Sequence, residues 1–230
     1  MQINKIDSFP SFCTALREAG FSMGGSNDEG IFSLCTYFSE NLVSHTGNAE
    51  TDPWEWRIRG ITECNDLAYS KLFFNKGGWI TKEWFPYFMA VRREHKTLTK
   101  MYSDGLISHA AKRIYDVIRD SPDIAFHEIK MMVNCDKSQT YKFEAALTML
   151  QMKMFILISG QKCKLSKEGK EYGWPVTTFC TTENFFGEEI FDLSCEISQQ
   201  EAADRITEQI LVLNPNADPK VILKFIGIGK

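Results

Sequence analysis

The sequence predicts a mainly helical α+β protein, built from winged helix-turn-helix units with short β-hairpin wings. Several segments place apolar residues at helical spacing behind a capping residue, as in Ser108–Arg119. In the middle of the chain, three such segments follow one another and lead into a short apolar strand, Phe155–Ile158. At 230 residues and 43% hydrophobic, the chain can bury a core as one large domain or as two to three small ones.

Residues 1–100 are predicted to form a helical, winged-helix-like domain. Its first helix is Ser8–Ala19, which a serine caps and a glycine ends. A second helix begins at Asp52, followed by a proline at the first helical position. We expect a third helix that begins near Leu67 and ends at Gly77-Gly78, and a fourth over residues 81–91.

Residues 101–170 are predicted to form the winged-helix domain proper. The expected elements are helices over 108–119, 125–133 and 138–152, a strand over 155–158, a turn over 159–162, and a second strand or hairpin return over 163–169. Gln151 lies near the end of the third helix, where we expect an ordinary helix residue. The third helix of such a module enters the major groove of DNA, and the hairpin lies along the backbone.

Residues 171–230 are predicted to form a C-terminal segment that ends in helices. Gly173 and Pro175 indicate an irregular or strand-like start. Ser198 and Glu201 form a capping box for a helix that ends near Leu213. A last short helix starts at Asp218, again followed by a proline.

The basic residues are concentrated in the middle of the chain. The whole protein has a formal net charge of −4, but residues 91–170 carry an excess of six positive charges, whereas residues 1–90 and 171–230 carry net charges of −4 and −6. This distribution is typical of a localised surface that faces a polyanion. We therefore expect duplex DNA as a partner of the 91–170 segment. Chance clustering of solvated lysines remains the alternative.

Candidate DNA contacts are the polar residues of the third helix and the hairpin. They are Lys137, Gln139, Thr140, Lys142, Lys162, Lys164 and Lys167. Lysines suit phosphate contacts, which position a protein on DNA without specifying sequence. Gln139 and Thr140 suit base edges, and the absence of arginine from this helix argues against strong guanine readout. The alternative is a winged helix whose third helix packs inward and which binds other proteins or serves the structure alone.

A candidate pocket is predicted around the first domain's tryptophans. Its residues are Trp54, Trp56, Arg57, Glu63 and Tyr69. Aromatic rings with nearby carboxylates are the ingredients of a site for an extruded base. The alternative is that Arg57 and Glu63, together with Arg59, form a structural ion-pair cluster.

We expect neither a metal nor a cofactor. The seven cysteines are scattered without the paired spacing of a zinc site, and we expect them to be reduced and mostly buried. No apolar run approaches the roughly 20 residues that a membrane-spanning helix needs. The N-terminus lacks the basic-then-apolar layout of a signal peptide, so we expect a cytoplasmic protein with no membrane association.

An ordered series of motifs resembles a known family. A Trp-Arg segment (PWEWRIR) precedes a Tyr/Lys segment (AYSKL) and a proline-containing helix (EWFPYF), and the predicted winged helix follows. From about residue 50 to residue 190, the chain resembles the AlkZ-related proteins of the winged-helix superfamily that includes the bacterial DNA glycosylases AlkZ and YcaQ.

The resemblance implies an assembly of winged-helix units that embraces DNA. For the glycosylases it also implies excision of alkylated or cross-linked bases, attributed to a Gln-x-Gln or Gln-x-Asp motif near the N-terminal helical region. Residues 1–90 contain a single glutamine, Gln2, and neither motif. We therefore assign no catalytic residue. DNA binding without this chemistry, a glycosylase with a non-standard site, and a protein-interaction role all stay open.

Overall fold

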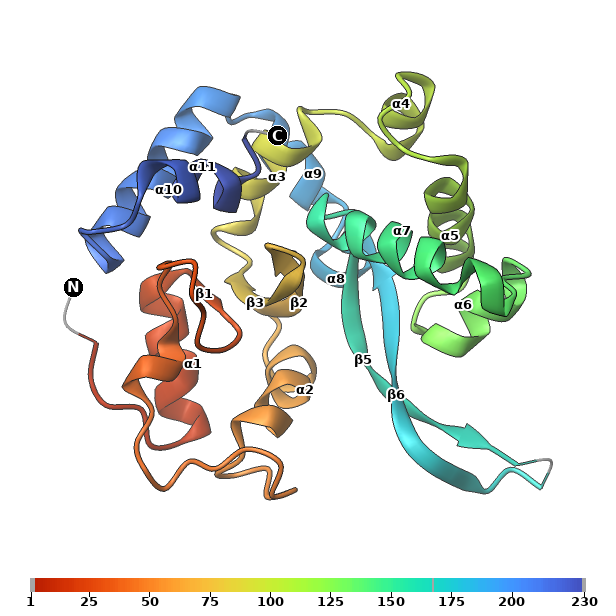
Figure 1. Ribbon diagram of the computed structural model, residues 1–230, viewed down its shortest axis with the longest axis horizontal. Helices are drawn as coiled ribbons and strands as arrows, with labels where there is room; N and C mark the ends of the chain where they lie inside the picture. The colour runs from red at the N-terminus through yellow and green to blue at the C-terminus, as the bar shows by residue number, and fades with distance from the viewer. Residues whose placement is uncertain (1–2, 167, 229–230) are drawn as a thin grey trace.

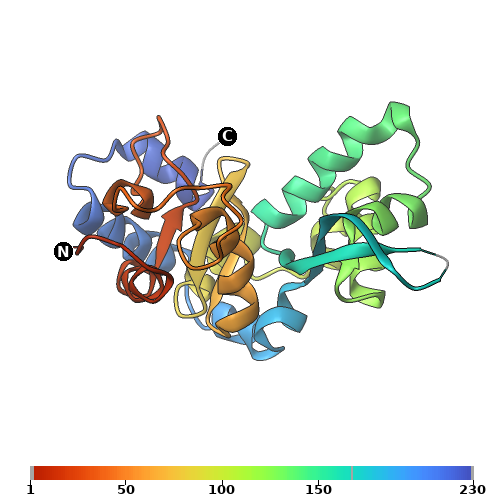
Figure 2. The same ribbon diagram turned by 90° about the horizontal axis from the view of Figure 1, so that it is seen from below.

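Two lobes lie side by side in the structure, a computed structural model that describes residues 3–166 and 168–228 (Figures 1 and 2). The first lobe comprises residues 3–93 and 182–228, so that both ends of the chain contribute to it. The second lobe comprises residues 94–181, and its β-hairpin projects away from the rest of the protein (Figure 1). The fold is α+β, as the sequence predicts: helices predominate over two small antiparallel sheets.

The first lobe begins with helices and a small sheet. Its elements up to residue 93 are α1 (Phe9–Ala19), β1 (Phe21–Met23), the 3-10 helix η1 (Leu34–Tyr37), α2 (Pro53–Glu63), β2 (Leu67–Phe73), β3 (Lys76–Thr81) and α3 (Phe85–Arg93). The predicted first and second helices are confirmed, and Ser8 and Asp52 precede α1 and α2 as N-caps. The predicted fourth helix forms as α3 but begins only at Phe85, because Thr81 ends β3 and pairs with Leu67 of β2. The sheet has the order β1-β3-β2, with antiparallel pairs.

The predicted helix from Leu67 to Gly77-Gly78 is wrong, because this segment is the β2–β3 hairpin. Phe74 and Asn75 form its turn with φ angles of 50° and 59°, as in a type I′ turn. The glycines belong to the strand: a Cβ atom on Gly77 would overlap a tyrosine hydroxyl, and one on Gly78 would overlap a phenylalanine ring. Both glycines therefore permit close packing across the hairpin rather than end a helix.

The C-terminal elements complete the first lobe. They are α8 (Thr182–Phe186), α9 (Glu189–Cys195), α10 (Gln199–Leu213) and α11 (Pro219–Ile226). The last two helices begin where their caps predict, at Ser198 and Asp218. One hydrophobic core contains residues of β1–β3 and α3 together with residues of α10 and α11, which are far apart in the sequence. A second core in this lobe packs α1 against α2 and β3.

The second lobe follows the order of elements expected for the middle segment. It contains α4 (Leu98–Ser103), α5 (His109–Asp120), β4 (Ile124–Ala125), α6 (Phe126–Met132), the 3-10 helix η2 (Lys137–Gln139), α7 (Thr140–Met152), β5 (Ile156–Leu165) and β6 (Glu171–Thr181). Its sheet has the antiparallel order β4-β6-β5. Apolar residues between Leu98 and Phe179 form its own core.

The hairpin of the second lobe is longer than predicted. The sequence predicts a turn over residues 159–162, but these residues lie within β5, and residues 160–162 pair with residues 176–178 of β6. Register irregularities next to Gly160 and between Lys162 and Lys164 bend the ladder without ending it. The hairpin therefore turns between Leu165 and Glu171, farther from the body of the lobe.

Two consecutive buried arginines at the end of α3 join the lobes. The guanidinium of Arg92 donates to the carbonyl oxygens of Leu72 (2.7 Å), Met152 (3.2 Å), Phe225 (2.6 Å) and Ile226 (2.9 Å), which end β2, α7 and α11. The next residue, Arg93, forms an ion pair of 2.6 Å with Glu183 of α8 within the first lobe, and it donates to the Met154 carbonyl oxygen of the second lobe. Cations at helix C-termini are favoured by the backbone dipoles.

Candidate nucleic-acid interface

The predicted contacts of the third helix lie at the start of α7. Lys137, Gln139 and Lys142 are exposed on η2 and the first turn of α7. The carboxylate of Asp136 accepts hydrogen bonds from the backbone N–H groups of Ser138 (2.8 Å) and Gln139 (3.0 Å). A hydrogen bond from the Ser138 hydroxyl, followed by these backbone donors, lowers the pKa of Asp136. The cap of this turn is thus Asp136.

A small cavity of about 190 Å³ lies beside this turn. Its polar lining includes Gln139 and Lys142, together with Arg113 of α5. Arg113 donates a 3.2 Å hydrogen bond to the Val133 carbonyl at the end of α6. The Thr140 hydroxyl already accepts a 3.0 Å hydrogen bond from the Lys130 ammonium, which uses part of its hydrogen-bonding capacity. The exposed side-chain amide of Gln139 therefore shares this cavity with the positively charged side chains of Lys142 and Arg113.

The hairpin lysines differ in their surroundings. Lys162 of β5 forms a 2.7 Å ion pair with Glu128 of α6. Lys164 is exposed opposite Tyr172, and among the described residues no carboxylate is within ion-pair distance of it. Lys167 lies outside the described residues. The positive charge of Lys164 is therefore open to a partner, whereas that of Lys162 is shared with a carboxylate.

Exposed aromatic side chains accompany these lysines. Trp174 on β6 is 90% exposed, Tyr172 is 54% exposed, and Tyr141 on α7 is 83% exposed. Sequence reasoning did not identify them as surface residues. Gly173 and Pro175, which flank Trp174, could have indicated its exposure. A glycine and a proline within a strand are typical of an edge or projecting segment. Aromatic rings next to lysines can stack on bases while the lysines contact phosphates.

The structure brings three residues of the predicted pocket together. The Arg57 guanidinium lies 3.1 Å from the ring centroid of Trp54 and 5.8 Å from that of Tyr69. Its Nε also donates a 2.8 Å hydrogen bond to the Trp54 carbonyl. Burial lowers the pKa of the Arg57 guanidinium, and Tyr69 opposes this change. Trp54 remains 44% exposed, so the cluster presents a stacked cation and an indole to the surface.

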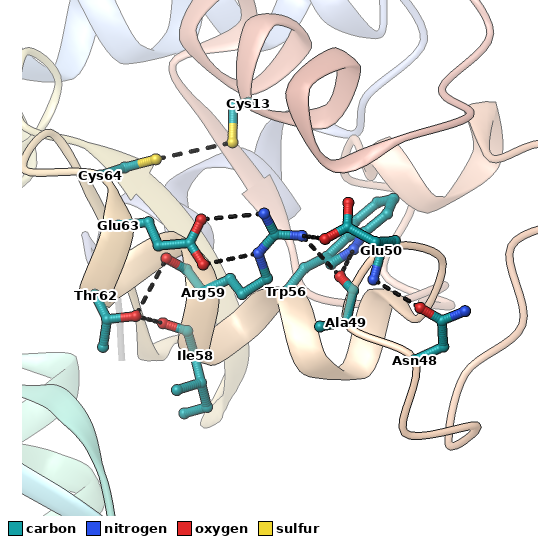
Figure 3. A network of polar contacts seen from close by, with 10 residues as sticks. All are labelled: Cys13, Asn48, Ala49, Glu50, Trp56, Ile58, Arg59, Thr62, Glu63 and Cys64. Atoms are coloured by element: carbon teal, nitrogen blue, oxygen red, sulfur yellow. Dashed lines mark hydrogen bonds and ion pairs between the residues drawn. The ribbon is translucent and has the colours of Figure 1, made fainter.

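The other two residues of the predicted pocket lie elsewhere. Trp56 is 1% exposed and packs against Phe12, with ring centroids 5.4 Å apart. Glu63 forms a two-point ion pair with Arg59, with distances of 2.8 and 3.1 Å (Figure 3). The cavity that Trp56 and Arg57 line has a volume of about 20 Å³, which is room for about one water molecule.

A cavity of about 420 Å³ lies where the two lobes meet. It is lined by Lys71 of β2, by Glu144 and Gln151 of α7, and by apolar residues of β5 and β6 such as Phe179. Its volume falls within the range of small-molecule sites, and both charge signs are present at its wall. The sequence did not predict this site, because Lys71 and Glu144 are separated by most of the second lobe.

Gln151 has a specific role, contrary to expectation. Its side-chain oxygen accepts from the Ser70 hydroxyl (2.8 Å) and from the Lys71 N–H (3.0 Å), and its amide nitrogen donates to the Leu147 carbonyl (3.2 Å). The side chain is 2% exposed. It therefore bonds α7 to β2 across the lobes.

The described residues hold neither a metal-binding group nor a membrane-spanning helix. No group of three or more His, Cys, Asp and Glu side chains there is arranged to hold a metal ion. None of the helices described combines the length and apolarity needed to cross a membrane.

Comparisons with known proteins gave one result. A family model described as "AlkZ related" matches residues 6–227, which is nearly the whole chain. Comparisons with curated proteins and with solved structures gave no match. The match extends the resemblance seen in the motifs to both lobes, and the chain belongs to the AlkZ-related family.

Proposed function

We propose that this protein binds duplex DNA through the second lobe, acting as a winged helix that spans the predicted unit 101–170 and the returning strand. Family membership supports the proposal, since the family's name relates it to AlkZ-type glycosylases. The observation that carries it is the projecting β5–β6 hairpin, where an exposed lysine, Lys164, lies beside the exposed Tyr172 and near Trp174. A cytoplasmic location is part of this proposal.

The side chains divide into two roles in this interface. Lys137, Lys142 and Lys164 contact phosphates, which contributes affinity that falls steeply with salt. Gln139 is the candidate for a base edge, because its amide can both donate and accept. Each phosphate contact contributes a slope of about −0.9 to a plot of log affinity against log salt.

Fluorescence anisotropy with a labelled duplex of about 20 base pairs tests the proposal across a salt series. Lys164→Glu is expected to reduce affinity at least tenfold and to lower the salt slope by about one. Lys224→Glu on α11, which is also exposed, serves as the matched control and should leave binding unchanged. Equal effects of the two substitutions would refute the assignment of the hairpin.

The protein-interaction alternative makes a different prediction. If the second lobe serves only protein contacts, the unmodified protein shows no affinity for duplex DNA even at low salt. That result would remove the proposal as a whole. Loss of binding in Lys137→Glu but not in Lys164→Glu would instead restrict the interface to α7.

A second candidate function is base excision at a non-standard site, and the 420 Å³ cavity favours it. Glu144 places a carboxylate at the wall, where it can orient a water molecule toward a glycosidic carbon. Release of a base from alkylated duplex DNA is the assay. Glu144→Gln should abolish release, whereas Glu63→Gln should retain it, because Glu63 is engaged by Arg59. An absence of release from the unmodified protein would dismiss this candidate while leaving DNA binding intact.

A further inference from the structure

Two cysteines from distant parts of the sequence face each other in the first lobe. Cys13 of α1 and Cys64, which follows α2, are 51 residues apart, and their sulfur atoms are 3.9 Å apart (Figure 3). Both are free thiols in the structure. A disulfide has an S–S bond of about 2.05 Å, so the two sulfurs would have to approach by about 2 Å.

An adjacent ion pair fixes the relative position of these thiols. Arg17 lies one helical turn after Cys13 on α1, and Asp66 lies two residues after Cys64. The guanidinium of Arg17 donates to both carboxylate oxygens of Asp66, at 2.7 and 2.9 Å. Bidentate pairs of this kind restrict orientation as well as distance. Helix α1 and the loop after α2 thus meet at two points, which are the Arg17–Asp66 ion pair and the contact between the sulfurs of Cys13 and Cys64.

The two thiols differ in their access to solvent. Cys13 is 4% exposed, and burial raises its pKa to about 12, with a further contribution from Cys64. Cys64 is half-buried and lines a cavity of about 410 Å³ that also contains Asn65 and Lys82. A small reagent can therefore reach Cys64 through this cavity, whereas Cys13 is buried and does not line it.

We propose that Cys13 and Cys64 are a modification site at which the two thiols form an intramolecular disulfide. The oxidant is a low-molecular-weight disulfide such as oxidised glutathione. The Cys64 thiolate attacks one glutathione sulfur, forms a mixed disulfide and releases one glutathione thiolate. The Cys13 sulfur, on losing its proton, then attacks the Cys64 sulfur and releases the second glutathione. Two protein thiols are oxidised, one glutathione disulfide is reduced to two thiols, and the balance is complete.

The bond would join α1 to the end of α2. That connection closes a loop of 51 residues, which restricts the unfolded chain. Helix α2 also presents Trp54 and Arg57 at the surface, so the bond would restrain the helix that carries this cluster. The inference does not depend on DNA binding.

The full chain is incubated with oxidised glutathione, and its thiols are mapped by peptide mass spectrometry. The expected product is a Cys13–Cys64 cross-linked peptide that lacks two hydrogens, with a rise in melting temperature of about 5 °C or more. Cys195 is exposed and serves as an internal control, which should take up glutathione without forming an internal bond.

Two variants make the test specific. Cys13→Ser should stop at a stable glutathione adduct on Cys64, because the resolving thiol is absent. Asp66→Asn should slow formation of the cross-link several-fold while leaving the reaction of Cys195 unchanged. The proposal is overturned if the unmodified protein accumulates the same Cys64 adduct as Cys13→Ser, or if only Cys195 reacts.

Discussion

Arg92 provides the strongest test of how the ends of β2, α7 and α11 are held together. Replacing it with methionine keeps most of the aliphatic volume but removes four hydrogen bonds to backbone carbonyls. A hydrogen bond from a charged donor contributes about 1.5–3 kcal/mol. Burying the guanidinium costs several kcal/mol, which offsets part of this contribution. We therefore expect Arg92→Met to lower the free energy of unfolding by about 3–5 kcal/mol.

Urea denaturation, followed by circular dichroism and tryptophan fluorescence, measures this loss. Burial lowers the pKa of Arg92 to about 9, so the side chain is charged at neutral pH, where the measurement is made. Arg119→Met is the matched control: Arg119 is 53% exposed in ion pairs with Asp116 and Asp120, and its loss should cost less than about 1 kcal/mol. If Arg92→Met also changed stability by less than about 1 kcal/mol, the four hydrogen bonds of Arg92 would not stabilise the fold.

Three further predictions concern the hydrogen bonds between α7 and β2, the ion pair between β5 and α6, and the β2–β3 hairpin. Gln151→Leu should cost about 1–3 kcal/mol in urea denaturation, because it leaves a buried hydroxyl and an N–H without their acceptor; an unchanged midpoint would contradict this. A hydrogen bond from Lys162 lowers the pKa of Glu128 below its ordinary value of 4.5, so the pair stabilises the fold above that pH and this stability is lost as pH falls through the folded-state pKa. The melting temperature of Glu128→Gln should accordingly depend less on pH between about 3 and 5 than that of the unmodified protein. Gly77→Ala should lower stability by about 1–3 kcal/mol through overlap with the neighbouring tyrosine hydroxyl, whereas Gly25→Ala, with open space around it, should be close to neutral in the same thermal scan.

Some features of the candidate sites could be predicted from local sequence, whereas others depend on segments that are far apart in the sequence. Lys137 and Lys142 could be predicted as surface residues, because Lys137 lies in the polar turn before α7 and Lys142 lies off the apolar stripe of α7. The pairing of Lys162 with Glu128 could not, since nothing in either segment indicates that β5 passes α6. The predicted pocket was divided in the same way. Trp54 and Arg57 are one helical turn apart and stack, whereas Trp56 turns inward to the core.

The β2–β3 hairpin shows why some elements escaped prediction. Leu67, Ala68 and Leu72 fit a helical period, but they fit the buried positions of a strand as well. The turn contains Phe74, which carries no turn signal, and its conformation is supported by the strands on either side. Pairing with β1 and burial in one core with α10 and α11 decided the outcome, and both involve residues far away in the sequence.

By itself, the sequence determined the capped helices, the order of elements in the middle segment and the membership of the AlkZ-related family. These depend on caps such as Ser108 and Ser198, and on periodicities that act within one or two helical turns. Only the tertiary structure decided that β1–β3 share one core with α10 and α11, that Gln151 bonds β2, and that Cys13 faces Cys64. The physical reason is range: a cap is satisfied by its own neighbours, whereas a buried polar group or thiol takes its partner from whichever segment packs against it.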